Sequence, residues 1–152
     1  MTINSASMTS ETRVRALFPD ASLRSYIFMG ATRSYLTGVS DYDPIIQSFG
    51  DVLVQVDDND YSGDTRALLR KDGRYGFLNF GWRSCSGCDG LQACSSYEDV
   101  EDLITSLKGD IKWFDTLAQA QAYIANDEER QGSYYYHQEE WEKFKTAVAE
   151  VA

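Results

Sequence analysis

Residues 72–94 read DGRYGFLNFGWRSCSGCDGLQAC, a strand-forming segment that leads into a loop of small residues. Aromatic side chains crowd residues 75–82 after the turn signal KDGR at 71–74, and such a run is typical of a β-strand. Glycine and serine then dominate residues 81–90, and these residues support neither a strand nor a helix. We therefore predict a strand followed by a loop of the kind in which small domains often place their chemistry.

The segments on the N-terminal side of this strand predict two more strands and a short helix. Residues 52–56 are rich in valine, and residues 65–70 follow the acidic, turn-rich segment DDNDYSGD at 57–64. Together with the aromatic strand they form a three-stranded antiparallel meander. Pro44 favours a helix that starts after Ser40 or Asp43 and ends at Gly50. Residues 1–12 are small and polar, and we expect a disordered tail there.

The C-terminal side predicts helices and one short strand. Ser96 and Asp99 have capping-box spacing, and the apolar residues that follow recur at helical spacing as far as Gly109. A strand at 111–114, a helix at about 116–124 and a last helix at about 135–151 complete the chain. The expected architecture is an α+β fold, in which an antiparallel β-meander of three to four strands packs against about three helices. Residues 13–152 are expected to form a single domain.

The formal net charge of −10 is concentrated in the C-terminal part of the chain. Residues 1–94 hold 11 acidic and 9 basic residues (net −2), whereas residues 95–152 hold 13 acidic and 5 basic residues (net −8). This charge serves solubility, but it also repels a nucleic-acid backbone and attracts basic protein surfaces. We therefore predict a protein with a basic surface as the partner and no direct contact with nucleic acid. The residues expected to contact the partner are Glu139, Glu140, Glu142, Tyr134, Tyr135 and Tyr136.

The sequence predicts a soluble protein of the cytoplasm. No apolar run approaches the roughly 18 to 20 residues that span a bilayer, and no basic segment followed by an apolar one opens the chain. Three cysteines, two of them close together, do not fit the disulfide framework of a secreted domain. A reducing compartment is the simplest expectation, and no membrane partner is expected.

The cysteines allow three interpretations. Cys85 and Cys88 have the spacing of a redox dithiol or of half a zinc site. Cys94 is available as a third zinc ligand and His137, the only histidine, as a fourth, although a second knuckle is missing. The alternatives are a reversible disulfide and reduced cysteines that pack as small hydrophobic side chains. The last of these is favoured, so we expect no cofactor and keep zinc as the alternative.

The loop that contains Arg83, Cys85, Gly87, Cys88 and Asp89 has a further candidate role. Successive backbone N–H groups can cradle a phosphate or carboxylate, although the loop lacks a lysine at phosphate-loop spacing. Gly87 is expected to take a positive φ angle, and Cys85 and Cys88 are expected to be mostly buried against the sheet edge.

Two kinds of activity are disfavoured. The acidic segment 57–64 resembles a calcium loop, but the required glycine and the terminal glutamate are missing, so a solvated hairpin turn is the simpler interpretation. No Ser-His-Asp or Cys-His pair has an informative spacing, and a single histidine in an aromatic helix is a poor general base. The chain is therefore not expected to be an enzyme.

Several of these segments resemble a family of small uncharacterised proteins encoded by bacteriophages. The matching stretches are YSGD at 61–64, YGFLNFGW at 75–82, SCSGCD at 84–89, LQAC at 91–94 and IKWFD at 111–115. The resemblance covers about residues 57–125, and the SCSGCD loop is its most specific part. It implies a phage protein that acts in the host cytoplasm, and it implies no particular activity or cofactor. Together with the charge, it predicts a protein that binds and modulates or inhibits a host factor, such as a defence or nucleic-acid-handling protein.

Overall fold

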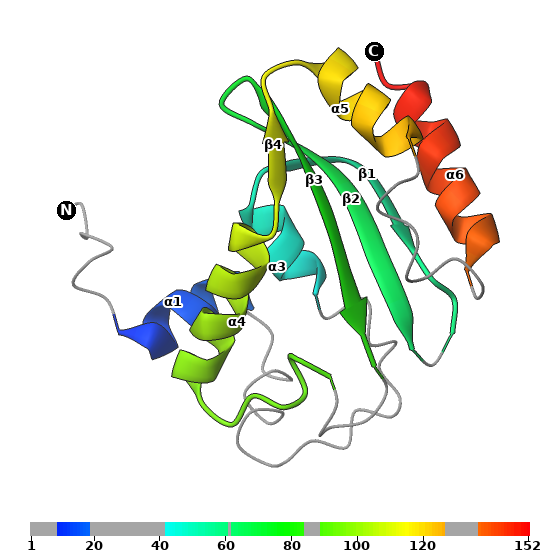
Figure 1. The fold of residues 1–152 in the computed structure, drawn as a ribbon. Helices are drawn as coiled ribbons and strands as arrows, with labels where there is room; N and C mark the ends of the chain where they lie inside the picture. The colour runs from blue at the N-terminus through cyan, green and yellow to red at the C-terminus, as the bar shows by residue number, and fades with distance from the viewer. Residues whose placement is uncertain (1–8, 19–41, 61, 84–88, 127–136) are drawn as a thin grey trace.

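The computed structural model describes residues 9–18, 42–60, 62–83, 89–126 and 137–152 of the chain, and its centre is a four-stranded antiparallel sheet (Figure 1). The strands are β1 (Asp51–Asp57), β2 (Gly63–Lys71), β3 (Arg74–Trp82) and β4 (Lys112–Phe114), and they pair in the order β1-β2-β3-β4. Asp72 and Gly73 join β2 to β3 with φ angles of 53° and 76°. Asp-Gly is the preferred pair for a two-residue turn of this kind, and the predicted tight turn is therefore present.

Helices cover both faces of the sheet (Figure 1). The first set consists of α1 (Ser10–Leu17), α3 (Asp43–Ser48) and α4 (Tyr97–Gly109), and the second of α5 (Leu117–Ala125) and α6 (Gln138–Ala149). Side chains alternate between the two layers along β2, where Ala67 and Leu69 join the core under the first set and Leu68 joins the core under the second. We call these the α4-side core and the α6-side core.

The predicted α+β class and the antiparallel meander are confirmed, and the short fourth strand is present. Five helices lie in the described part of the chain, more than the three expected. The predicted tail at residues 1–12 extends too far, because α1 begins at Ser10. The hydroxyl of Thr9 accepts the N–H of Thr12 (3.2 Å), and Arg13 binds Glu101 of α4 (Nε–Oε2 2.5 Å). An N-cap and a partner on another helix therefore order residues that composition alone assigns to a tail.

The starts of the helices show how the local sequence sets their positions. Ser96 caps α4 by accepting the N–H of Asp99 (3.1 Å), as the capping-box spacing predicts. Thr116 and Gln119 form a reciprocal capping box at the start of α5. No helix among the described residues is long and apolar enough to cross a membrane.

Candidate functional site

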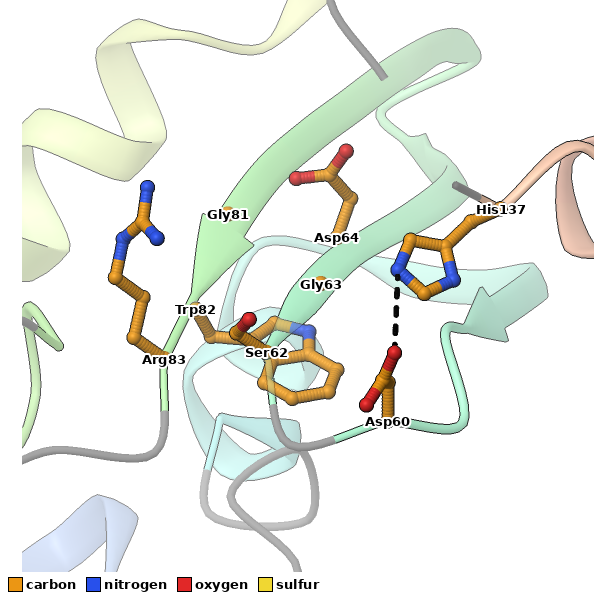
Figure 2. A pocket seen from close by; sticks show the side chains of 8 residues that line it. All are labelled: Asp60, Ser62, Gly63, Asp64, Gly81, Trp82, Arg83 and His137. Atoms are coloured by element: carbon orange, nitrogen blue, oxygen red, sulfur yellow. Dashed lines mark ion pairs between the residues drawn. The ribbon is translucent and has the colours of Figure 1, made fainter. Parts of the chain in front are cut away.

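A pocket of about 430 Å³ opens at the end of the sheet where β2 begins and β3 ends (Figure 2). The loop between β1 and β2, the last residues of β3 and the start of α6 all contribute to it. The pocket is lined by Asp60, Ser62, Gly63, Asp64, Gly81, Trp82, Arg83 and His137. Segments distant in the sequence therefore bring four ionisable side chains, Asp60, Asp64, Arg83 and His137, to this pocket.

The acidic loop between β1 and β2 folds around the side chain of Asp58. The N–H of Asp58 donates to the carbonyl of Asp64 (3.0 Å), and the Asp58 Oδ2 accepts the N–H of Asp64 (2.6 Å). A Cβ on Gly63 would lie 2.5 Å from the Cβ of Asp58, so only glycine fits there. Asp58 is 3% exposed, so the interpretation of this segment as a solvated turn is wrong for this residue.

Asp58 forms a fully buried ion pair with Arg66 of β2. The Nη1 of Arg66 lies 2.8 Å from the Asp58 Oδ1, and the guanidinium stacks over the ring of Trp141 at 5.1 Å from its centroid. The Nε and Nη2 of Arg66 have no hydrogen-bond partner among the described residues. Arg66 therefore balances the charge of Asp58 and fixes one of its oxygens, while Oδ2 faces the start of α6.

His137 and Glu140 bring α6 to this buried carboxylate. His137 is the N-cap residue of α6, and its side chain makes no capping hydrogen bond. Its Nε2 lies 3.7 Å from Asp58 Oδ2 and 3.9 Å from Asp60 Oδ2, and Figure 2 shows the second of these approaches. One ligand atom each of Asp58, His137 and Glu140 lie within 4.8 Å of one another. We call Asp58, Asp60, His137 and Glu140 the carboxylate–histidine cluster.

Behind the pocket, on the α4 side of the sheet, a chain of polar contacts connects Trp82 to Asp57. The indole Nε1 of Trp82 donates to the Thr65 hydroxyl (3.0 Å), which donates to the Asp57 Oδ1 (2.7 Å). Burial raises the pKa of the Asp57 carboxyl above its ordinary value, and hydrogen bonds from Thr65 and Gln55 partly oppose that rise. These contacts hold the Trp82 wall of the pocket in a fixed position.

The structure describes only the two ends of the cysteine loop. Arg83 is exposed and lines the pocket, and Asp89 is buried. The Asp89 Oδ1 accepts the N–H of Arg83 (2.8 Å), and its Oδ2 accepts the Tyr42 hydroxyl (3.0 Å) and the N–H groups of Leu91 (3.1 Å) and Gln92 (3.0 Å). Asp89 thus ties the end of β3 to the turn before α4. Cys85, Gly87 and Cys88 lie outside the described residues, so the predictions made for them stay predictions.

The two predicted zinc ligands that the structure describes lie on different sides of the sheet. Cys94 belongs to the α4-side core, and its thiol donates to the carbonyl of Gly90 (3.3 Å). Burial, reinforced by nearby aspartates, raises the pKa of the Cys94 thiol to about 11. His137 instead lies among carboxylates at the start of α6. The structure therefore does not bring Cys94 and His137 together, and Cys94 packs as a small buried side chain.

The predicted partner-binding residues divide into three groups. The side chains of Glu139 and Glu142 are 80% and 49% exposed, and they lie 3.5 Å from Lys143 and Lys145 respectively. They border a shallow groove of about 410 Å³ on the outer face of α6. Glu140 is half-buried and belongs to the carboxylate–histidine cluster. Tyr134, Tyr135 and Tyr136 lie outside the described residues.

The carboxylate–histidine cluster was not predicted from the sequence, although two local signals mark it. Asp58 and Asp60 are separated by one residue, and His137 and Glu140 have the i, i+3 spacing that places two ligands on one helix face. Their association depends on tertiary packing between β1, β2 and α6. In the comparisons with known proteins, no family model, curated protein or solved structure matches the chain.

Proposed function

We propose that the protein binds a divalent transition-metal ion through Asp58, His137 and Glu140, beside the pocket at the end of the sheet, which His137 also lines. One imidazole nitrogen and two carboxylates are a donor set that suits Zn²⁺, Mn²⁺ or Fe²⁺. The observation that carries the proposal is that these three donors, two at the start of α6 and one from the β1–β2 loop, lie within 4.8 Å of one another.

The spacing around His137 supports a shared ion more than a direct hydrogen bond. Its Nε2 lies 3.7 and 3.9 Å from two carboxylate oxygens, beyond the length of a normal hydrogen bond. Two ligands bound to one tetrahedral ion at about 2.1 Å are separated by about 3.4 Å, so a small contraction brings them into coordination. Glu140 has no hydrogen bond or ion pair within the described part of the chain.

The local charge also favours a divalent cation. Asp58, Asp60 and Glu140 contribute −3 and Arg66 contributes +1, which leaves −2 for the group when His137 is neutral. Ligand carboxylates in metal sites are usually held by outer hydrogen bonds. Asp58 has such support from Arg66 and from the N–H of Asp64. An N–H donor occupies only one lone pair of Oδ2, so the oxygen keeps a second one for a metal.

Titration calorimetry of untagged protein, treated with EDTA and then titrated with Mn²⁺ or Zn²⁺, tests this proposal. We expect one ion per chain, and we expect Glu140→Gln to weaken binding about tenfold or more. Glu139→Gln is the matched control, because it removes the same charge from the adjacent residue, whose side chain is 80% exposed. No binding by the parent protein, or equal losses in the two variants, would refute the proposal.

A second function, binding to a basic protein partner, is supported by the exposed acidic side chains of α6. Glu139 and Glu142 project from its outer face, on the part of the chain with a net charge of −8. In this proposal the partner is a host protein that the phage-like protein inhibits or modulates in the cytoplasm. A Glu139→Lys/Glu142→Lys variant should recover less of such a partner from a host lysate than the parent. A Glu98→Lys/Asp102→Lys variant on exposed positions of α4 provides a charge-matched control. Equal recovery with both variants would argue against the α6 surface.

A further inference from the structure

We infer that the pocket binds a phosphate-type oxyanion between the metal ion and the guanidinium of Arg83. This inference rests on the proposed metal site, and it identifies the chemical class of the pocket's ligand. Three protein ligands leave a tetrahedral or octahedral ion with at least one open position, which an anionic oxygen can occupy.

The metal ligand His137 and the guanidinium of Arg83 lie on opposite sides of the pocket. His137 and Asp60 form one side, and Arg83 at the end of β3 forms the other (Figure 2). The Arg83 side chain is exposed, and it has no hydrogen bond or ion pair with the described residues. Its backbone is fixed, because the Arg83 N–H donates to Asp89 and its carbonyl accepts from the Gln92 side chain (3.0 Å). A fixed backbone and a guanidinium with no partner among the described residues suit bidentate recognition of an oxyanion.

The wall between these groups offers one neutral donor. Ser62 adds a hydroxyl that can donate to an oxyanion, whereas Cβ atoms on Gly63 and Gly81 would lie 2.5 Å from Asp58 and 3.2 Å from Asp64. A volume of about 430 Å³ exceeds that of inorganic phosphate, so the pocket accommodates a phosphomonoester as well. The shared chemistry of both ligands is the phosphate group.

Charge makes this binding depend on the metal. Four carboxylates (Asp58, Asp60, Asp64 and Glu140) and two guanidiniums (Arg66 and Arg83) give the pocket and cluster a net charge of −2 when His137 is neutral. A phosphate dianion is therefore repelled by the metal-free protein. A divalent ion brings the sum to zero and provides a direct ligand bond. Anion binding without metal is not expected.

Titration calorimetry with inorganic phosphate tests the inference, with AMP as the phosphomonoester and acetate as a carboxylate control. The parent protein is measured both saturated with Mn²⁺ and after EDTA treatment. We expect phosphate and AMP to bind only the Mn²⁺ form, and acetate to bind at least tenfold more weakly. Tighter binding of AMP than of phosphate would identify a phosphomonoester as the better ligand, and the reverse order would identify free phosphate.

Two arginine variants make the test specific. Arg83→Gln should weaken phosphate binding about tenfold or more and leave Mn²⁺ affinity unchanged. Arg70→Gln removes an exposed arginine that pairs with Asp51 at the other end of β2, and it should change neither affinity. Normal Mn²⁺ binding without phosphate binding, or equal effects of the two variants, would overturn the oxyanion inference and leave the metal proposal standing. Failure of the parent to bind Mn²⁺ would overturn both.

Discussion

Replacing Asp89 by alanine should destabilise the protein more than any single exposed substitution, because one buried carboxylate accepts four hydrogen bonds. Three of the donors are backbone N–H groups, those of Arg83, Leu91 and Gln92, and the fourth is the Tyr42 hydroxyl. The Asp89→Ala variant leaves each of these donors without its carboxylate partner. The end of β3 and the turn before α4 lose their common attachment.

The size of the loss in unfolding free energy depends on which of the four donors find another acceptor. Leu91 N–H also donates to the Tyr42 oxygen (3.0 Å), so it keeps a partner. Arg83 and Gln92 N–H groups are part-buried, water can reach them, and each should cost about 1 kcal/mol. The Tyr42 hydroxyl is buried, and the loss of its hydrogen bond to Asp89 should cost about 2 kcal/mol. The expected total is about 4 kcal/mol, a large part of the roughly 5 to 15 kcal/mol that stabilises an ordinary domain.

Urea unfolding followed by far-ultraviolet circular dichroism, in the presence of a reductant, measures this loss. Tyr42→Phe is the partner variant for a double-mutant cycle, and it should cost about 1 to 2 kcal/mol alone. In the double variant the N–H of Leu91 loses both of its acceptors, and this cost of about 1 to 2 kcal/mol should offset the saving from breaking the shared Tyr42–Asp89 bond only once. A loss below 1 kcal/mol for Asp89→Ala would refute this account of the loop anchor.

Three further predictions follow from single groups. Since burial raises the pKa of Cys94 to about 11, a Cys85→Ser/Cys88→Ser protein should resist thiol alkylation at pH 8 until it is unfolded; rapid labelling of the native form would contradict this. Hydrogen bonds, the strongest from Arg13, lower the pKa of Glu101 to about 2. This carboxylate therefore stabilises the fold above its unfolded pKa of about 4.3. Glu101→Gln should therefore destabilise at pH 7, and its difference from the parent in urea unfolding should shrink as the pH falls from about 5 to 2. Without metal at pH 8, the Glu140→Gln variant should be more stable than the Glu139→Gln variant by about 1 kcal/mol, because the substitution relieves repulsion within the cluster. Equal melting curves of the two variants would argue against that repulsion.

The sheet could be predicted from the sequence because its determinants are local. An Asp-Gly turn with two positive φ angles joins β2 to β3, and aromatic and β-branched residues fill the strands. The start of α4 was equally clear from Ser96 and Asp99. The α1 boundary was missed because the contacts of Arg13 with Glu101 join segments far apart in the sequence.

The candidate site was not predictable for the same reason. Composition treats the acidic segment at 57–64 as a solvated turn, whereas packing buries Asp58 beneath α6. The sequence predicts that His137 lies within an aromatic helix, but it is the N-cap residue of α6 and faces the β1–β2 loop. Arg66 was the missed signal, since a charged residue in an otherwise buried strand segment requires a partner on the same face.

The Asp58–Arg66 pair supports the proposal that this end of the sheet binds a ligand. A buried ion pair gains little over well-packed apolar residues, because desolvation offsets most of the attraction. Here the cost is increased by two N–H groups of Arg66 that lack partners among the described residues. His137 and Glu140 add an imidazole and a carboxylate to the same place, where a metal-free protein would be more stable with neutral side chains. Departures from good packing usually coincide with functional sites. A cation that binds Asp58, His137 and Glu140 would turn the repulsion among these carboxylates into attraction, and it would fix α6 to the β1–β2 loop beside the pocket.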